Sequence, residues 1–451
     1  MSVFNALSTA VSGINAQSTA FTNLSNNIAN SQTTGYKANS TSFQDFVAGS
    51  LSGAEAPGGI SDSVAAVTVQ HVDNQGAASV STDTLALKIS GNGLFDVSKE
   101  TGATTSGATQ FQQQQYYTRN GEFYENKAGY LVNTAGYYLD GYNVNPNDGT
   151  LGTAVTPINV ANVAFRPTQA TTLTTTGTLP MTGTTATSAV ATVYDGNYDQ
   201  TKPTANSGAI QLNWTQVNST TWTVEAATAA SPTGVGSVAV SDADGYTGPY
   251  TVKFNSDGTL ASITDSSATP RSVSSALSGA AANIPITVTY GDGTVQNIEM
   301  NLGTIGGTTG MTVATTSAAT SAEPTLVSDS VTSGNYTGVS IESDGSVMAN
   351  FDNGDTQLIA KVALTNFANV NGLNAVDGQA YTATANSGNA VTGLVGQNGT
   401  GTLSVGYVES STTDLTSDLS ALIVAQEAYT ANTKIVTTAD QLLQATIAMK
   451  Q

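Results

Sequence analysis

Few residues in this 451-residue chain have the types and spacing that catalysis requires. His71 is the only histidine and cysteine is absent, which leaves no credible serine or cysteine triad. A Gly-x-Ser-x-Gly nucleophile elbow does not occur either. Glycoside hydrolysis needs two carboxylates that face each other across a cleft, but nothing in the sequence singles out such a pair. We therefore predict that the protein is not an enzyme.

Three short motifs look like ligand sites but lack the full pattern. Asp242–Gly245 and Asp352–Asp355 resemble calcium loops without the ligand spacing of such loops, so both predict hairpin turns. Gly91–Gly93 lacks the third glycine and the following helix of a dinucleotide loop. His71 stands apart from any carboxylate cluster and predicts a strand residue, not a metal ligand. The sequence thus predicts no cofactor and no metal.

The composition limits the possible partners. Charged residues make up 10% of the chain, against roughly 25% in an average soluble protein, and the formal net charge is −20. Only 12 residues are lysine or arginine, and they form no basic stripe that could bind nucleic acid or anionic lipid. No apolar run is long enough to span a membrane, and the N-terminus lacks the features of a secretory signal. We expect no nucleic-acid partner and no membrane insertion.

Apolar residues recur with helical spacing at both ends of the chain. The N-terminal stripe predicts a helix of about 25 residues and consists of Phe4, Leu7, Val11, Ile14, Phe21, Leu24 and Ile28. The C-terminal stripe predicts a closing helix and consists of Leu415, Leu419, Leu422, Tyr429, Val436, Leu443 and Ile447. Isolated helices are marginal in water, so each helix needs a partner, and the nearest candidate is the other helix. Such stripes are as typical of docked core helices as of assembly surfaces.

The sequence between the helices predicts β structure. Residues 85–89 alternate in polarity, and Gly91–Gly93 predicts a hairpin turn into a strand over 94–97. A Thr-rich segment from about residue 168 predicts either a domain boundary or exposed β edges, and 315–332 predicts a second linker. Trp214 and Trp222 could stack on a sugar, but paired strand aromatics are more often core residues.

This order predicts a mainly β protein with terminal α-helices and a nested, multidomain plan. We expect the N- and C-terminal helices to pair as a coiled-coil-like inner domain, with one or more β-domains outside it. The predicted ranges are a helical polymerisation domain at 1–32 and 414–451, an extended or β linker region at 33–70, a discontinuous β-domain at 71–167 and 333–413, and an inserted outer β-domain at 168–332.

Several blocks of the sequence resemble the flagellar rod and hook protein family. "NLSNNIANSQTTGYKANSTSFQD" looks like the N-terminal signature of the family and contains its turn at Gly35, Tyr36 and Lys37. "GNGLFDV", "YYTRNGEFYENKAGYLVNTAGYYLDGY", "DGSVMANFDNGDTQLIAKVALTNFANVNGL" and "LSALIVAQEAYTANTKIVTTADQLLQATI" resemble later blocks, in the same order. The length and the large insert favour a hook-type member over the shorter distal rod type. The family's Glu-Ser-Asn-Val-Asp before the last helix appears here as Glu409–Asp414, with an extra residue.

The resemblance implies a structural subunit that forms a homopolymer of many copies. The assembly would be the hook of a bacterial flagellum, a hollow, flexible tube that acts as a universal joint and as an export channel. Implied partners are the distal rod, hook cap and hook–filament junction proteins and the flagellar type III export apparatus. The location would be extracellular, without a cleaved signal peptide. On the residues alone, a secreted carbohydrate-binding or adhesive β-protein stays an alternative.

The resemblance also favours reading both apolar stripes as a helical assembly interface. No charged residue precedes Lys37, whereas the C-terminal helix carries Asp418, Glu427, Lys434, Asp440 and Lys450. A charge at a contact between identical copies would be repeated along the wall of a tube as like-charge repulsion. We therefore predict that the C-terminal helix faces a water-filled channel and that the N-terminal helix lies between it and neighbouring copies.

Overall fold

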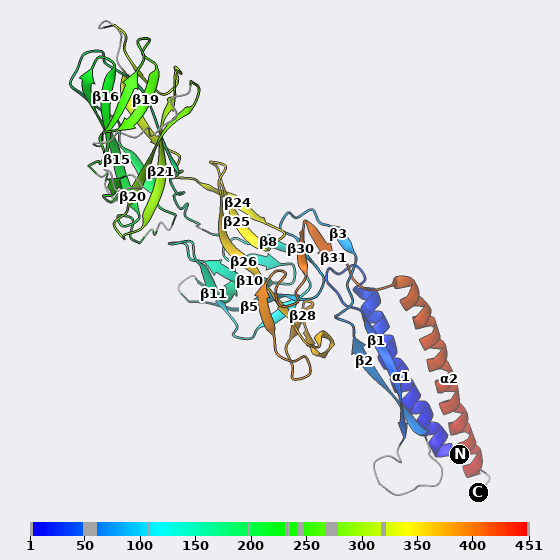
Figure 1. Cartoon of the computed structure of the whole chain (residues 1–451). Helices are drawn as coiled ribbons and strands as arrows, with labels where there is room; N and C mark the ends of the chain where they lie inside the picture. The colour runs from blue at the N-terminus through cyan, green and yellow to red at the C-terminus, as the bar shows by residue number, and fades with distance from the viewer. Residues whose placement is uncertain are drawn as a thin grey trace.

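The molecule is long and consists of a helical end, a middle β-domain and an outer β-domain in a row (Figure 1). The computed structural model describes residues 3–47, 61–105, 108–161, 163–196, 199, 201–230, 232, 235–241, 248–266, 278–316 and 322–448. Both termini lie at the helical end, so the chain runs out to the outer domain and returns. Strands dominate, with one long helix at each end of the chain, which confirms the predicted fold class. Among the described residues, no helix combines the length and apolar character that a membrane crossing needs.

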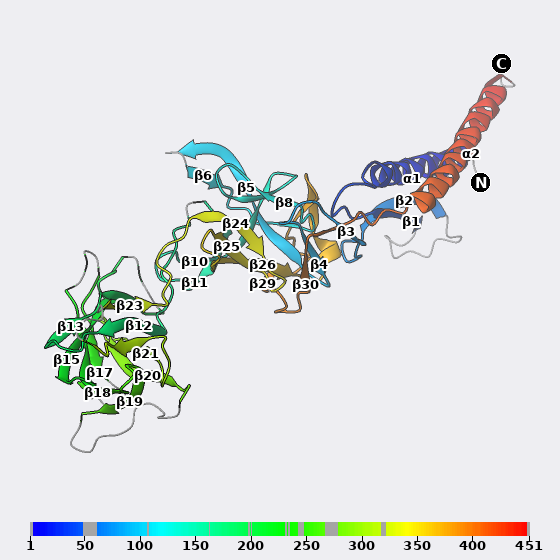
Figure 2. The ribbon, with the colours of Figure 1, turned by 90° about the horizontal axis from the view of Figure 1, so that it is seen from above.

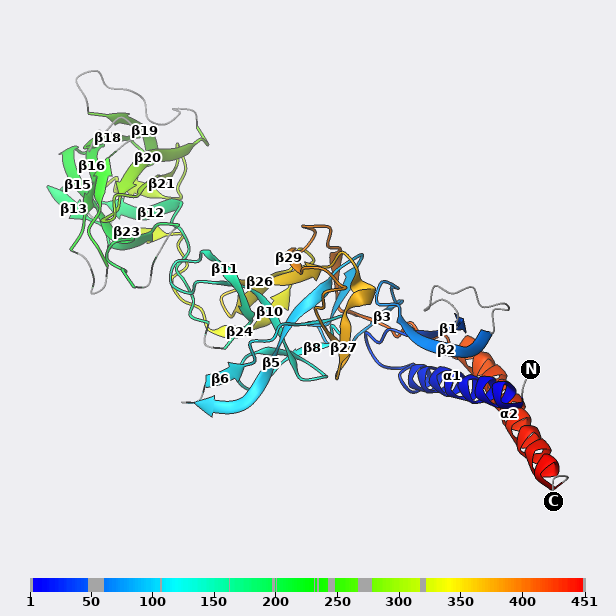
Figure 3. The ribbon, with the colours of Figure 1, turned by 90° about the horizontal axis from the view of Figure 1, so that it is seen from below.

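The helical end contains two antiparallel helices and a β-hairpin. α1 (Val3–Ala29) and α2 (Leu415–Ala448) lie side by side, and α2 extends past the N-terminal end of α1 (Figures 2 and 3). Asp414 caps α2, because its Oδ1 accepts hydrogen bonds from the backbone N of Thr416 (3.0 Å) and Ser417 (3.2 Å).

The region predicted as a linker over 33–70 forms a long hairpin that packs on α1. Its strands are β1 (Asn39–Val47) and β2 (Ser61–Gln70), paired from Asn39↔Gln70 onward. Asn23 on α1 fastens the hairpin, since its Nδ2 donates to the Oγ1 atoms of Thr41 (2.8 Å) and Thr68 (3.0 Å). The helical end is therefore a three-part unit of α1, α2 and the hairpin.

The middle β-domain is built from two distant stretches of chain. Its 13-stranded sheet consists of β5 (Leu94–Thr105), β6 (Ala108–Phe111), β7 (Tyr116–Thr118), β8 (Phe123–Glu125), β9 (Leu131–Asn133), β10 (Tyr137–Val144), β11 (Leu151–Pro157), β24 (Tyr336–Ile341), β25 (Ser346–Phe351), β26 (Thr356–Asn366), β27 (Asn374–Val376), β28 (Ala380–Thr382) and β29 (Val391–Leu394). β26 pairs with both β10 and β5, which joins the two stretches at the centre of the sheet. The predicted turn at Asp352–Asp355 connects β25 to β26 and is confirmed.

The hairpin predicted at Gly91–Gly93 is wrong. β4 (Leu87–Ser90) pairs with β30 (Thr402–Val405) and not with β5, and β3 (Ala78–Val80) likewise pairs with β31 (Tyr407–Glu409). Gly91 and Gly93 have φ angles of 110° and 116°, so the chain turns out of one sheet and into the next. The partner of β4 lies more than 300 residues further along the chain, where a local pattern cannot indicate it.

The outer β-domain has two six-stranded sheets around one core. The first sheet contains β12 (Thr172–Leu179), β17 (Ala239–Ser241), β20 (Ala281–Thr289), β21 (Val295–Thr304), β22 (Met311–Val313) and β23 (Ala322–Ser328). The second contains β13 (Thr185–Thr187), β14 (Ala191–Tyr194), β15 (Ser207–Asn218), β16 (Thr221–Thr228), β18 (Tyr250–Phe254) and β19 (Leu260–Asp265). Trp214 and Trp222 are 0% exposed in this core, which confirms them as core residues.

The segment 315–332, predicted as a linker, contains β23, so that interpretation is wrong over the strand. The Thr-rich segment, predicted as a domain boundary or exposed β edges, contains β12 and also β13, which is an exposed strand at the edge of its sheet. β12 and β23 pair with each other, from Leu173↔Ser328 onward. β12 is also no exposed edge, because it has neighbours on both sides and buries Leu173 and Thr175. Because these segments are rich in threonine, the few apolar positions of the strands did not stand out as a strand pattern in the sequence. Residues 317–321 and the predicted turn at Asp242–Gly245 lie outside the described residues.

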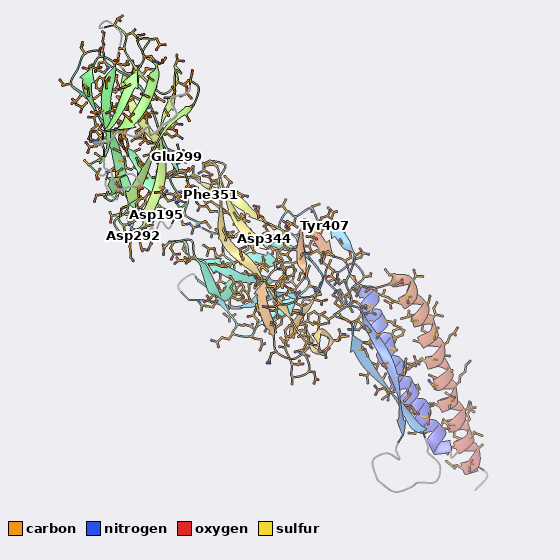
Figure 4. The ribbon with its side chains drawn as sticks, in the orientation of Figure 1. Asp195, Asp292, Glu299, Asp344, Phe351 and Tyr407 are labelled. Carbon is orange, nitrogen blue, oxygen red and sulfur yellow. The ribbon has the colours of Figure 1, made fainter. Side chains whose placement is uncertain are left out.

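The crossing between the two β-domains is narrow. The ring of Phe165 meets the ring of Phe351, which is labelled in Figure 4, edge-on with the ring centroids 4.9 Å apart. The backbone N of Thr168 donates to the carbonyl of Val331 at 3.0 Å. The two β-domains have separate cores, one drawn from residues 85–160 and 341–403 and the other from 170–326. The domain bounds given from the sequence stay predictions.

His71 lies just beyond the end of β2, so its prediction as a strand residue is wrong by one position.

Candidate assembly surface and joint

The two terminal helices approach each other through small side chains. Ala10, Ala16 and Ala20 are the buried apolar residues of α1. A Cβ added to Gly13 would come within 2.9 Å of Asn432 Nδ2 on α2, so a larger residue there would require the Asn432 side chain to shift. On α2, Ala425 and Ala439 are buried as well. The fully buried apolar side chains described on the two helices are therefore all alanines, and Gly13 lies where the helices approach closely.

The predicted apolar stripe of α1 lies largely outside this contact. Val11 and Phe21 are 44% and 43% exposed, and Leu7, Ile14, Leu24 and Ile28 are half-buried. The side chain of Phe4 lies outside the described residues. The stripe is thus available at the surface, and its interpretation as an interface stays a prediction.

The predicted stripe of α2 divides between two faces. Leu422, Val436 and Leu443 are half-buried on the side of Ala425 and Ala439. The other predicted residues are exposed, namely Leu415, Leu419, Tyr429 and Ile447. Further exposed apolar residues were missed by the heptad pattern, namely Ile423, Val424, Ile435 and Leu442. A helix that is apolar on several faces signals contact on several sides.

The β1–β2 hairpin adds exposed apolar residues to those of α1 and α2. A groove of about 530 Å³ lies between α1, β1 and α2, and its apolar lining includes Leu24, Phe43 and Val424. Phe43 and Val67 are exposed on the hairpin. Neither residue belongs to the predicted stripes, although exposed aromatic and β-branched residues on a two-stranded ribbon indicate a contact surface.

The family turn lies at the joint between the helical end and the middle β-domain. Lys37 Nζ lies 2.5 Å from Glu409 Oε1, and Arg119 Nη1 lies 3.1 Å from Glu409 Oε2. The side chains of Lys37 and Glu409 are each 1% exposed. Lys37 also donates to the carbonyl of Asn74, and Glu409 accepts from the backbone N of Gly76 at 2.7 Å. One buried charge network therefore ties the start, middle and end of the chain together.

The backbone of the turn fits this network closely. Gly35 has a φ of 71°, and a Cβ there would lie 2.7 Å from the backbone N of Asn120. Its backbone N donates to the carbonyl of Glu409 at 2.8 Å. Tyr36 OH donates to Asn27 Oδ1 at 3.1 Å, which links the turn to α1. Gly35, Tyr36 and Lys37 thus contact three different parts of the molecule.

Burial sets the electrostatics of the joint. Desolvation lowers the pKa of Lys37, and the Glu409 carboxylate opposes that shift. The charges of Arg119 and Lys88 lower the pKa of Lys37 further. Removing Glu409 would leave two cations together in a dry site, so this carboxylate is essential to the joint.

Three protein-family profiles match the chain in order. The Flagella basal body rod protein profile matches residues 7–37, and the Flagellar hook protein FlgE/F/G D1 domain profile matches 88–179. The Flagellar basal body rod FlgEFG protein C-terminal profile matches residues 404–449. Helix, joint and closing helix are thus those of this group, and the chain belongs to the flagellar rod and hook protein family.

Within that family the full-length similarity is to hook proteins. The flagellar hook protein FlgE of Escherichia coli (strain K12) is 29% identical over 454 residues, covering 99% of this chain and 100% of the relative. That of Brucella suis biovar 1 (strain 1330) is 28% identical over 457 residues and covers 100% of both chains. The solved Helicobacter pylori flagellar hook protein FlgE2 covers 73% of this chain and all of its own, at 15% identity and a TM-score of 0.34. The chain is a structural subunit of hook type.

Proposed function

We propose that copies of this chain polymerise through their helical ends into the hollow tube of a flagellar hook. The observation that carries the proposal is where the exposed apolar side chains gather. Phe21, Ile423 and Val424 lie on the two helices and Phe43 lies on the hairpin, all four of them exposed. Burying a large apolar side chain contributes about 1.5–3 kcal/mol, so a ring of neighbours would stabilise this end substantially.

The distribution of charge supports a definite orientation of the helices in the tube. α1 carries no charged residue, so it can be enclosed by neighbours without desolvating a charge. α2 carries Glu427, Lys434 and Asp440, and all three are exposed. We infer that α2 lines a water-filled channel and that α1 is enclosed between α2 and adjacent copies.

The division into three parts suits a universal joint. A helical tube would transmit torque, while outer domains held by narrow connections would slide past one another during bending. We infer a location outside the cell, with the distal rod, hook cap and hook–filament junction proteins as neighbours and export by the flagellar type III apparatus. We also infer a structural and not a catalytic role.

The carbohydrate-binding alternative loses its main support. Trp214 and Trp222 are fully buried, so neither ring can stack on a sugar at the surface.

Cryo-electron microscopy of the assembled full-length protein tests the proposal. The expected result is a tube with α2 nearest the axis and α1 enclosed. A wall with α1 facing the lumen contradicts the orientation, and protein that stays monomeric at high concentration in every salt contradicts polymerisation.

A further inference from the structure

The groove between α1, β1 and α2 lies near the start of α2 and has a volume of about 530 Å³. Asp418, Ala421 and Val424 line it from α2, and Phe43 lines it from β1. Val424 is 65% exposed and Phe43 is 48% exposed, so apolar surface of the groove is open to solvent. An open apolar recess of this kind marks a contact site and calls for an apolar occupant.

The other end of α2 extends past α1. The side chain of Asp418 is hydrogen-bonded to Asn27, and Asn432 lies against Gly13. One step forward along α2 therefore corresponds to one step back along α1. Continued to the start of α1, this antiparallel register ends near residue 442, and α2 runs on beyond it (Figures 2 and 3). We call residues 442–448 the overhang.

The overhang is exposed and apolar. Leu442 is 54% exposed and Ile447 is 64% exposed, and no residue of the overhang is charged. A short stretch of helix is marginal in water unless it packs against a partner. An apolar groove can enclose the overhang without removing any charge of the overhang from water.

The groove and the overhang are complementary but cannot meet within one chain. Ala421 in the groove and Ile447 on the overhang lie about 40 Å apart along the same helix, at about 1.5 Å per residue. Asp418 is the charged residue of the described lining, and Lys450, which follows the overhang in the sequence, has the opposite sign. A contact between two unlike surfaces repeats from copy to copy, and where the rotation does not close into a ring it produces an open filament.

We propose that the overhang of one copy docks in the groove of the next copy, so that the copies join head to tail along α2. This inference rests on the proposed polymerisation and adds to it the contact that links successive copies. Ile447 of one copy lies against Val424 and Phe43 of the next. Successive copies in such a row are displaced by about 40 Å along α2.

Cross-linking between introduced cysteines tests the contact, because the chain has no cysteine of its own. The test variant combines Ala421→Cys in the groove with Ile447→Cys on the overhang, both at exposed positions. A short bis-maleimide cannot span the two thiols within one helix, so every cross-link joins two copies. Assembled tubes should give a ladder of dimers, trimers and larger products in denaturing gels, whereas each single variant should stay monomeric.

The matched control keeps Ile447→Cys and moves the other thiol to Glu427→Cys. Glu427 is exposed on α2 but does not line the groove, so we expect at least about tenfold less cross-linked product. Equal ladders from the two pairs overturn the inference. Tubes that give no ladder with Ala421→Cys and Ile447→Cys also overturn it, while polymerisation itself stands. Dimers from Ala421→Cys alone would mean that groove faces groove, which contradicts a head-to-tail contact.

Failure of the wild type to form tubes contradicts the proposed function, and the same cross-linker on concentrated, unassembled protein then decides the docking. A ladder from the double variant supports the head-to-tail contact, and its absence overturns it. Cryo-electron microscopy of tubes gives a second measurement. We expect the end of a neighbour's α2 in the groove, at the stated displacement, and any other element there, such as a neighbour's hairpin, overturns the inference.

Discussion

The helical end and the outer β-domain treat their large apolar side chains in opposite ways. The outer domain hides its bulkiest residues, Trp214 and Trp222, completely. The helical end hides Ala10, Ala16 and Ala20 and leaves Val11 and Phe21 more than two-fifths exposed. Acidic residues such as Asp292 and Glu299 lie on the outer domain, whereas α1 has no charge at all (Figure 4).

This difference separates a part that completes its own core from a part that needs copies to complete it. An exposed apolar patch on a single chain marks a contact site. The fully buried apolar residues described on α1 and α2 are alanines, while larger side chains such as Phe21, Ile423 and Val424 stay exposed. The opposite arrangement, with large side chains inside the pair, would have produced a stable monomer with nothing left to bury on assembly.

The largest expected effect comes from a charge placed on the exposed stripe of α1. Phe21→Asp should abolish tube formation, because each copy would bring an unpaired carboxylate into an apolar contact. Electron microscopy and sedimentation measure the loss, and Phe21→Leu is the matched control that should still assemble. Ala16→Lys is a less clean test, since Ala16 is buried inside the subunit and its replacement disturbs the fold as well. A normal yield of tubes from Phe21→Asp would contradict the inference that the exposed apolar residues of the helical end are buried on assembly.

A substitution that creates a cavity in the core of the outer domain should strongly lower the stability of that domain and should not affect assembly. Trp222→Ala should lower the unfolding free energy of that domain by about 3–5 kcal/mol. The chain has only two tryptophans, both in this domain, so the fluorescence of the remaining Trp214 follows the outer domain alone. Val217→Ala, at a residue 61% exposed, should change stability by less than about 0.5 kcal/mol. Loss of tubes in a folded Trp222→Ala protein would mean that the outer domain also drives assembly.

The sequence predicted the two terminal helices and the two core tryptophans, because spacing and side-chain type reveal both directly. It did not predict which face of α1 turns inward, since Ala10, Ala16 and Ala20 hardly register in an apolar pattern. A search for small residues at helical spacing would have found that face. Threonine-rich composition similarly concealed the paired strands β12 and β23.

Contacts between distant residues were beyond any local pattern. Lys37 and Glu409 are 372 positions apart, and the resemblance indicated the turn at Lys37 without its partner. Glu409 begins the segment that departs from the family pattern, yet its side chain bonds to both Lys37 and Arg119. A buried lysine on its own predicts an acidic partner, but only the fold shows which one.

The joint between the helical end and the middle β-domain should be next in sensitivity. Glu409→Gln should destabilise the connection by about 3 kcal/mol, because Lys37 and Arg119 would lose their shared counter-charge in a buried site. Hydrogen exchange of amides in β3, β4 and the start of α2 measures the effect. Tryptophan fluorescence of the outer domain should not change. Lys361→Met, which breaks an exposed pair with Asp344, is the control and should cost less than about 1 kcal/mol. Equal effects from the two substitutions would show that the joint network contributes no more than a surface ion pair.

The smallest expected effect is a pH dependence of the stability of the middle β-domain, which the outer β-domain should not share. Burial raises the pKa of Asp96 to about 7 and that of Asp140 to about 6, and the charge of Asp140 contributes to the shift of Asp96. Both groups keep their proton in the folded chain at pH values where the unfolded chain has lost it. Stability is therefore fully present below pH 4 and falls as pH rises, until about pH 6 for Asp140 and about pH 7 for Asp96.

Asp96→Asn removes one of these groups and keeps an acceptor for the Thr365 hydroxyl, which lies 2.8 Å from each carboxylate oxygen. Relative to wild type, its unfolding free energy should rise by about 1.4 kcal/mol per pH unit between pH 5 and 6. Hydrogen exchange of β5 and β10 amides across this range measures it, with tryptophan fluorescence as the internal control for the outer domain. Asp140→Asn should move the upper end of the Asp96 window to lower pH, because it removes the neighbouring negative charge. A pH response shared equally by the tryptophan signal would mean that the two β-domains unfold as one unit, and their separate cores would then not behave as separate domains.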